Sequence, residues 1–198
     1  MATIISTKTS GVGGLSVTGD ASGVLQLASA NGTTALTIDA SQNVTFAKSI
    51  LTSATAVSAS GTSIDFTGIP SWVKRVTVLF NASGTNGTSL VQVQLGSGSV
   101  ANTGYVSFAS SATNNASSTT GFVTTYALNP GQYVAGIMTI CLVSGFSYVS
   151  SGSTSLGAVN AGSAWGTKTL SGALDRVRIT TVNGTDTFNS GSINIMYE

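Results

Sequence analysis

The acidic side chains are the first candidates for chemistry, and the chain has six of them: Asp20, Asp39, Asp65, Asp175, Asp186 and Glu198. It has no histidine, which excludes a Ser-His-Asp or Cys-His nucleophile system and a histidine zinc site. Cleavage of a polysaccharide needs two carboxylates facing one cleft, and Asp65 with Asp175 is the pair that stays open. Because Asp175 is followed by Arg176, an ordinary surface ion pair is the favoured interpretation. We therefore expect no enzymatic activity, no metal and no cofactor.

Three other side chains are candidate surface or glycan contacts. Arg176 and Arg178 are two residues apart, so they share one face of an expected strand. They would bind an acidic neighbouring surface or an anionic glycan, or, alternatively, serve as charges that discourage edge-to-edge strand pairing. Trp165 lies among small residues, which predicts an exposed loop where its ring would stack on a sugar.

The charge content is low and argues against several partners. Only 7% of residues are charged, and seven Lys and Arg against six Asp and Glu give a net charge of +1. Such a chain has no electropositive field for phosphates, so we expect no nucleic acid partner. The longest apolar stretch, from Tyr133 to Val149, falls short of the ~20 apolar residues of a membrane-spanning helix. A net charge near zero also favours a working state that is an assembly.

The composition predicts a folded protein without disulfides. The chain has 198 residues, of which 41% are hydrophobic, enough for a core in one large or two small domains. Cys141 is the single cysteine, within an apolar run, so no intrachain disulfide can form. This favours folding in the cytoplasm of the cell that makes the protein.

A short unit recurs from Gly13 to Phe46, in which an apolar residue, any residue and a second apolar residue are followed by a turn sequence. The apolar positions are Leu15, Val17, Leu25, Leu27, Leu36, Ile38, Val44 and Phe46. The spacing predicts short strands joined by tight turns. One chain cannot bury these apolar faces alone, so we expect three chains to wind into a stalk with these residues as its core. The alternative is a small open meander packed on the following domain.

The remainder predicts a second domain. Residues 48–60 look like a connector, which sets a boundary near residue 55 and gives domains of 1–55 and 56–198. Beyond the boundary, Val91, Val93 and Leu95 alternate with Gln92 and Gln94, as expected for strands with one face in the core and the other in solvent. Similar runs recur with turn signals between them, and about eight strands fit. We therefore expect an all-β protein whose second domain is a jelly-roll-like antiparallel β-sandwich.

Three stretches resemble structural proteins of tailed phages. They are GTTALTIDASQNVTF at residues 32–46, GTSIDFTGIPSWVKRVTVLF at 61–80, and LSGALDRVRITTVNGTDTFNSGSINIMYE at 170–198. The middle, roughly residues 97–166, matches no such motif. The resemblance implies a virion protein and brings no catalytic residues with it. It does not distinguish a tail fibre from a head fibre or a capsid decoration protein.

Together these features predict a non-enzymatic homotrimer on the surface of a phage particle, assembled in the host cytoplasm. It would be a head fibre or capsid decoration (cement) protein, or a short tail fibre for host adhesion. Ile4 and Ile5 would anchor it to another virion protein, the major capsid or a tail protein, by adding a strand. A host surface glycan is a further candidate partner. The alternatives are a carbohydrate-binding module and, less favoured, a polysaccharide depolymerase.

Overall fold

The computed structural model describes residues 22–28, 34–46, 51–111, 114–157 and 160–198. In these ranges the protein consists of antiparallel strands, turns and irregular segments without any helix. Accordingly, none of the described residues belongs to a helix that is long and apolar enough to span a membrane. The chain divides into two compact units, residues 1–50 and 51–198, a few residues before the boundary expected at 55.

The described part of the first unit is a three-stranded sheet in the order β1-β2-β3. Its strands are β1 (Leu25–Ala28), β2 (Thr34–Ile38) and β3 (Val44–Phe46). The turn between β2 and β3 is held by Asp39, whose Oδ1 accepts hydrogen bonds from the backbone N–H groups of Ser41 and Asn43, both at 2.9 Å. The short side chain of Asp39 thus replaces backbone partners in the turn, which explains why this residue type stands there.

The strand register places six apolar side chains of this sheet on one face. Residues paired across antiparallel strands point to the same side, because side chains alternate along each strand. One row across the sheet is Leu25, Ile38 and Val44, and the next is Leu27, Leu36 and Phe46. The opposite face carries the polar row Gln26, Thr37 and Thr45. The sheet is therefore amphipathic across its whole width.

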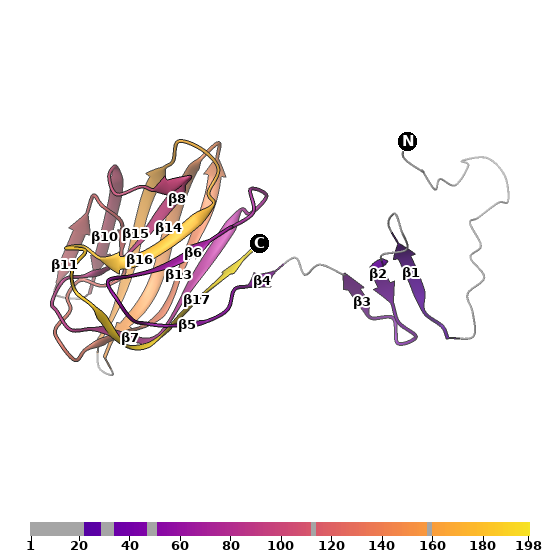
Figure 1. Ribbon diagram of the computed structural model, residues 1–198, viewed down its shortest axis with the longest axis horizontal. Coiled ribbons are helices and arrows are strands. Elements are labelled where there is room, and N and C mark those ends of the chain that lie inside the picture. Colours follow the sequence, from indigo (N-terminus) through magenta and orange to yellow (C-terminus); the bar gives the residue numbers. More distant parts are fainter. Residues whose placement is uncertain (1–21, 29–33, 47–50, 112–113, 158–159) are drawn as a thin grey trace. The chain divides into compact units, whose positions relative to one another are not determined.

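The second unit is a sandwich of two antiparallel sheets (Figure 1). The larger sheet has the order β11-β10-β15-β14-β13-β7-β17-β4, with β5 also paired to β17. Its strands are β4 (Thr52–Ser53), β5 (Val57–Ser58), β7 (Arg75–Thr85), β10 (Tyr105–Ser110), β11 (Asn115–Ser118), β13 (Tyr133–Ser144), β14 (Ser147–Leu156), β15 (Asn160–Thr169) and β17 (Phe188–Tyr197). The smaller sheet has the order β12-β8-β16-β6, with β9 also paired to β8. Its strands are β6 (Ser63–Thr67), β8 (Val91–Ser97), β9 (Ser99–Val100), β12 (Phe122–Val123) and β16 (Arg176–Thr181).

The connections between the two sheets are those of a jelly roll. Eight strands fill its places in chain order: β6, β7, β8, β10, β11, β12, β15 and β16. The first, eighth, third and sixth of these form the smaller sheet, and the second, seventh, fourth and fifth lie in the larger one. The hairpin of β13 and β14 is inserted between the second and seventh strands, and because it adds two strands, all neighbours remain antiparallel. The all-β sandwich expected from the sequence is confirmed.

The core lies between the two sheets and is built from alternating apolar residues of both. Val91, Val93 and Leu95 of β8 and Val177 and Ile179 of β16 are fully buried from the smaller sheet. Facing them from the larger sheet are buried residues that include Val78, Met138, Ile140, Ile193 and Ile195. The Tyr105 ring meets Phe122 edge-on, with ring centroids 5.0 Å apart, and fills the end of this core.

The segment expected to be an unstructured connector contributes two strands. Within residues 48–60, β4 pairs with the Met196 region of β17 and β5 pairs with Ser192 and Ile193. Strands of two residues carry no periodic signal, so their pairing depends on β17, which lies about 140 residues further along the chain. The larger sheet therefore begins at Thr52, before the expected boundary.

Candidate functional site

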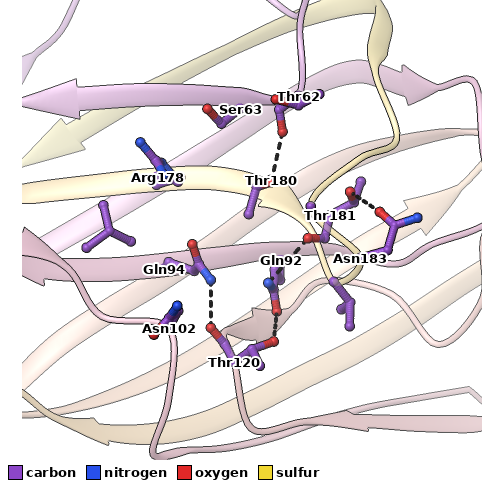
Figure 2. Close-up of a pocket in the computed structure, with 13 residues that line it drawn as sticks. Thr62, Ser63, Gln92, Gln94, Asn102, Thr120, Arg178, Thr180, Thr181 and Asn183 are labelled. Carbon is purple, nitrogen blue, oxygen red and sulfur yellow. Dashed lines mark hydrogen bonds between the residues drawn. The ribbon is translucent and has the colours of Figure 1, made fainter.

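A polar hollow of about 340 Å³ lies on the outer face of the smaller sheet (Figure 2). It crosses three neighbouring strands, with Ser63 on β6, Arg178 and Thr180 on β16, and Gln92 and Gln94 on β8. Three further segments complete its lining: one with Val100 and Asn102, one with Thr120, and the turn of residues 182–184 after β16. Pockets for small ligands have volumes of roughly 300–1,000 Å³, so this hollow has room for a small ligand or for part of a chain.

Gln92 and Gln94 are buried although they point away from the core. Their neighbours Val91, Val93 and Leu95 point inward, so strand alternation directs both glutamines to the outer face. Their exposed fractions are nevertheless only 1% and 6%. The segment with Val100 and Asn102, next to β9, and the segment with Thr120, before β12, cover the two glutamines. This part of the sheet face is therefore a hollow and not a flat surface.

Hydrogen bonds hold these amides in fixed orientations. Gln94 Nε2 donates to the Thr120 carbonyl oxygen at 2.8 Å. Gln92 Oε1 accepts from the hydroxyls of Thr120 at 2.9 Å and Ser118 at 3.2 Å, and Gln92 Nε2 donates to the Thr181 carbonyl at 3.4 Å. A buried polar group is costly unless it is paired, so this network both satisfies the amides and fixes the hollow's shape.

Several polar groups in the hollow keep hydrogen-bonding capacity. Among the described residues, none forms a hydrogen bond with Gln94 Oε1, the Asn102 side-chain amide or the Ser63 hydroxyl. Figure 2 shows the Gln94 oxygen on the side of the amide that points away from Thr120. The hollow thus presents an acceptor, a hydroxyl and an amide that are all free to meet a ligand.

The charge of Arg178 is balanced by Asp65. Arg178 Nε and Nη2 donate to the two oxygens of Asp65 at 2.7 and 2.8 Å, a bidentate pair between directly opposed residues of β16 and β6. The hydrogen bond to Asp65 raises the pKa of Arg178 above its ordinary value. Of the five N–H groups of the guanidinium, three are left for other partners. Arg178 can therefore donate hydrogen bonds to a ligand in the hollow, while Asp65 balances its positive charge.

A second pair of the same kind lies next to it on the chain. Arg176 Nε donates to Asp175 Oδ1 at 2.7 Å, and this hydrogen bond lowers the pKa of the Asp175 carboxyl below its ordinary value. Asp175 Oδ2 also accepts from the Gly98 backbone N–H at 2.9 Å. The ion pair expected for Asp175 is present, and Arg176 is its partner; neither of the two lines the hollow.

Asp65 and Asp175, the carboxylates considered for glycoside cleavage, are thus each bound to an arginine. A general acid needs a raised pKa, whereas that of Asp175 is lowered. In the described ranges, moreover, no three Cys, Asp or Glu side chains come together as a metal site would require. The geometry gives no support to a hydrolytic site.

Trp165 lies on the opposite outer face of the sandwich, and on a strand rather than on the expected loop. It belongs to β15, where Ala164 points into the core and Trp165 points outward with 47% of its surface exposed. Its ring stacks on Phe108 of β10, its directly opposed neighbour, with centroids 6.3 Å apart. Small residues around Trp165 are explained by close strand packing, since a Cβ at Gly166 would overlap the Phe122 ring. The candidate contacts Trp165 and Arg178 are therefore on different sheets and cannot contact the same small ligand.

The residues expected to form the stalk core are partly described. Leu25, Leu27, Val44 and Phe46 remain 40–53% exposed, and Leu36 and Ile38 are half-buried. Leu15 and Val17, together with the proposed anchors Ile4 and Ile5, lie outside the described residues.

Comparisons with known proteins add no relative. No protein-family model matches the chain, and neither a curated protein nor a solved structure matches it significantly.

Sequence reasoning identified Arg178 but missed the other residues of the hollow. Gln92 and Gln94 were expected in solvent, on the polar face of a half-buried strand. Their alternation with valines gave the correct face, but the segments that cover this face come from residues 99–103 and 118–121. A signal was present only in the residue type, because two glutamines at strand spacing place two amides side by side on one face.

Proposed function

We propose that the chain is a non-enzymatic structural protein displayed on the surface of a tailed-phage particle as a homotrimer. The sandwich is the displayed domain, and the first unit mediates assembly. Its place on the particle would be that of a head fibre or capsid decoration protein, or of a short tail fibre. The major capsid protein or a tail protein would be its neighbour.

One observation carries the assembly in this proposal: among the described residues, four of the six apolar side chains on one face of the β1-β2-β3 sheet (Leu25, Leu27, Val44 and Phe46) are 40–53% exposed. Covering an exposed apolar face is favourable in water, and contiguous apolar patches on a surface usually mark an interface. Burying the exposed half of each of four large side chains would add roughly 1 kcal/mol apiece. Self-association is the simplest way to obtain this free energy.

Three copies fit this sheet better than two. Two sheets stacked face to face would leave the edges of β1 and β3 unpaired, and such edges promote further aggregation. With three copies around an axis, β1 of one chain would pair with β3 of the next, which covers both the faces and the edges. A closed cyclic assembly follows from one repeated interface.

The test is the solution mass of the full chain by light scattering at micromolar concentration. We expect a trimer for the native chain and a monomer for Leu27→Gln/Phe46→Gln, which makes the apolar face polar. The matched control is Thr37→Gln/Thr45→Gln, with the same new residues on the opposite face, and it should remain trimeric. A monomeric native chain, or equal loss of assembly in both double variants, would refute the proposed assembly.

Location is tested separately with antibody labelling of purified particles. Regularly spaced label on the head would support a head fibre or decoration protein, and label at the tail would support a tail fibre. Particles without label would contradict the virion proposal whatever the mass.

The carbohydrate-binding alternative is favoured by the polar hollow on the outer face of the smaller sheet. A depolymerase is disfavoured because Asp65 and Asp175 are each paired with an arginine. Release of sugars from a polysaccharide, lost on Asp65→Asn, would be the result needed to restore it.

A further inference from the structure

The geometry points to the hollow on the β8 and β16 face as a binding site for an uncharged saccharide. This inference deepens the proposed function, on which it rests for its biological setting, because a displayed domain meets the glycans of the host surface.

The floor of the hollow is polar, ordered and built before any ligand arrives. Gln92, Gln94 and Thr181 are nine-tenths or more buried, and each makes at least one hydrogen bond within the network. Groups that are already oriented lose little conformational entropy on binding, which favours affinity for a matching ligand. An ordinary solvated strand face would show mobile, exposed side chains instead.

The groups left free suit hydroxyl groups. Gln94 Oε1 accepts, the Ser63 hydroxyl and the Asn102 amide both donate and accept, and Arg178 donates. A sugar hydroxyl is itself a donor and an acceptor, so neighbouring hydroxyls on one ring can satisfy such a mixed set at once. A ligand with acceptors alone, such as a phosphate, would leave the Gln94 oxygen unpaired.

Charge argues for a neutral sugar. Asp65 neutralises Arg178 through both its oxygens, and the neighbouring Asp175 and Arg176 neutralise each other. An anionic ligand would gain little here, because the positive charge is already compensated. Val100 and Val182, also in the lining, offer apolar contact to the C–H faces of a pyranose ring.

The aromatic pair of Phe108 and Trp165 is the competing location for a sugar. Its hollows are lined mainly by apolar and small side chains, and no charged residue lines them. A stacking platform lacks the buried, oriented amides of the polar hollow, so it offers less to distinguish one sugar from another. The two faces belong to different sheets, and a substitution on one leaves the other intact.

The experiment uses the full-length protein and immobilised oligosaccharides of defined composition. Neutral probes are hexasaccharides of glucose, galactose, mannose, rhamnose and N-acetylglucosamine, and anionic probes are polysialic acid and alginate. Affinity for each bound probe is then measured in solution for three variants: Asn102→Ala in the hollow, Asn189→Ala as its matched control on β17, and Trp165→Ala on the competing face. Both asparagines are exposed, so the fold should tolerate either change.

We expect at least one neutral probe to bind, weakly per site and more tightly to the assembled trimer through avidity. Asn102→Ala should weaken this binding by about tenfold, the loss of one or two hydrogen bonds. Asn189→Ala and Trp165→Ala should leave it unchanged. In the native protein, the bound sugar should also slow amide exchange in residues 99–103 and 182–184. If Asn102→Ala weakened binding only by altering the structure elsewhere, the sugar would not protect these amides of the native hollow.

Three outcomes would overturn the inference: no neutral probe bound at millimolar concentration, binding of anionic probes alone, or binding abolished by Trp165→Ala and retained in Asn102→Ala. Failure of the proposed assembly is distinguishable, since it appears in the mass and not in the sugar affinity. A monomer that binds sugar through Asn102 would preserve the site and refute the trimer.

Discussion

The β1-β2-β3 sheet and the sandwich are both made of strands that alternate apolar with polar residues, yet they differ in what covers the apolar side. In the sandwich, Val93 and Ile179 are fully buried, because a second sheet of the same unit lies over them. In the three-stranded sheet, Leu27 and Phe46 are both 51% exposed. The difference shows that alternation defines a face but does not determine whether its cover comes from the same chain or from another.

The same holds for residues that point outward from the sandwich. Gln94 points outward and is buried, whereas Trp165 points outward and is half exposed. Covering segments, and not residue type, decide which of the two is hidden.

The largest expected effect contrasts two phenylalanines. Phe122→Ala removes a fully buried ring and should lower the free energy of unfolding of the sandwich by about 3–5 kcal/mol. Phe46→Ala should leave that free energy unchanged and weaken assembly only. Chemical denaturation, followed by the fluorescence of the sandwich tryptophans, measures both. If Phe46→Ala destabilised the sandwich as much as Phe122→Ala, the two regions would not be independent and the comparison would fail.

A smaller effect is expected at Tyr105, whose hydroxyl is buried in the sandwich. It accepts a hydrogen bond from the Leu95 N–H at 2.7 Å and donates to the Ala101 carbonyl at 3.1 Å. Tyr105→Phe leaves these two groups unpaired and should cost about 1–3 kcal/mol. The same denaturation experiment measures this loss of unfolding free energy. Tyr126→Phe is the control, and we expect little change there because none of the described residues forms a hydrogen bond with the Tyr126 hydroxyl.

The pH dependence at Tyr105 sharpens this result. Burial raises the pKa of its hydroxyl above the ordinary value of 10.0, so the ionised form is more accessible in the unfolded chain. The contribution to stability is complete below pH 10 and is lost as the pH rises above it. Native protein should thus lose more stability than Tyr105→Phe between neutral pH and strongly alkaline pH, and parallel curves would contradict the assignment.

Hydrogen exchange offers a direct comparison of the two regions. Amides of the β2 strand, such as that of Thr37, should exchange faster on dilution, because their protection depends on other copies. Amides of β8, such as that of Val93, should not respond to concentration. Protection of β2 that is independent of concentration would mean that its cover comes from the same chain.

The smallest effect concerns the β2–β3 turn at low pH. A hydrogen bond from the Asn43 side chain is the main cause that lowers the pKa of Asp39 below its ordinary value of 3.8. Its stabilisation of the turn is therefore present above that value and is lost as the pH falls through the lower pKa of the folded state. We expect the native chain to dissociate gradually as the pH falls into the acid range. The Asp39→Ala variant should self-associate more weakly than the native chain already at neutral pH. Mass measurements across this pH range compare the two.

Much of the fold was predictable because strand alternation is local. The runs at Val91–Leu95 and Val177–Ile179 indicated their core faces correctly, and the apolar stretch from Tyr133 to Val149, too short for a membrane-spanning helix, lies in the hairpin of β13 and β14. The strands β4 and β5 were not predictable, because two residues carry no period. Trp165 was expected on a loop because the small residues beside it resemble a turn sequence. In the structure, Gly166 instead leaves room for the Phe122 ring to pack closely against β15.

The sequence by itself determined the all-β class, the apolar face of each strand and the near absence of net charge, since all three depend on residue type and short-range spacing. Tertiary structure alone decided which faces are covered. It placed Trp165 and Arg178 on different sheets and paired Asp65 with Arg178 across 113 positions of sequence. It also buried Gln92 and Gln94 beneath residues 99–103, which fold back on the end of β8, and beneath the segment with Thr120, which is 26 positions from Gln94. The reason is physical: a strand's own residues fix the direction of its side chains, but burial depends on chain segments that the fold brings from elsewhere.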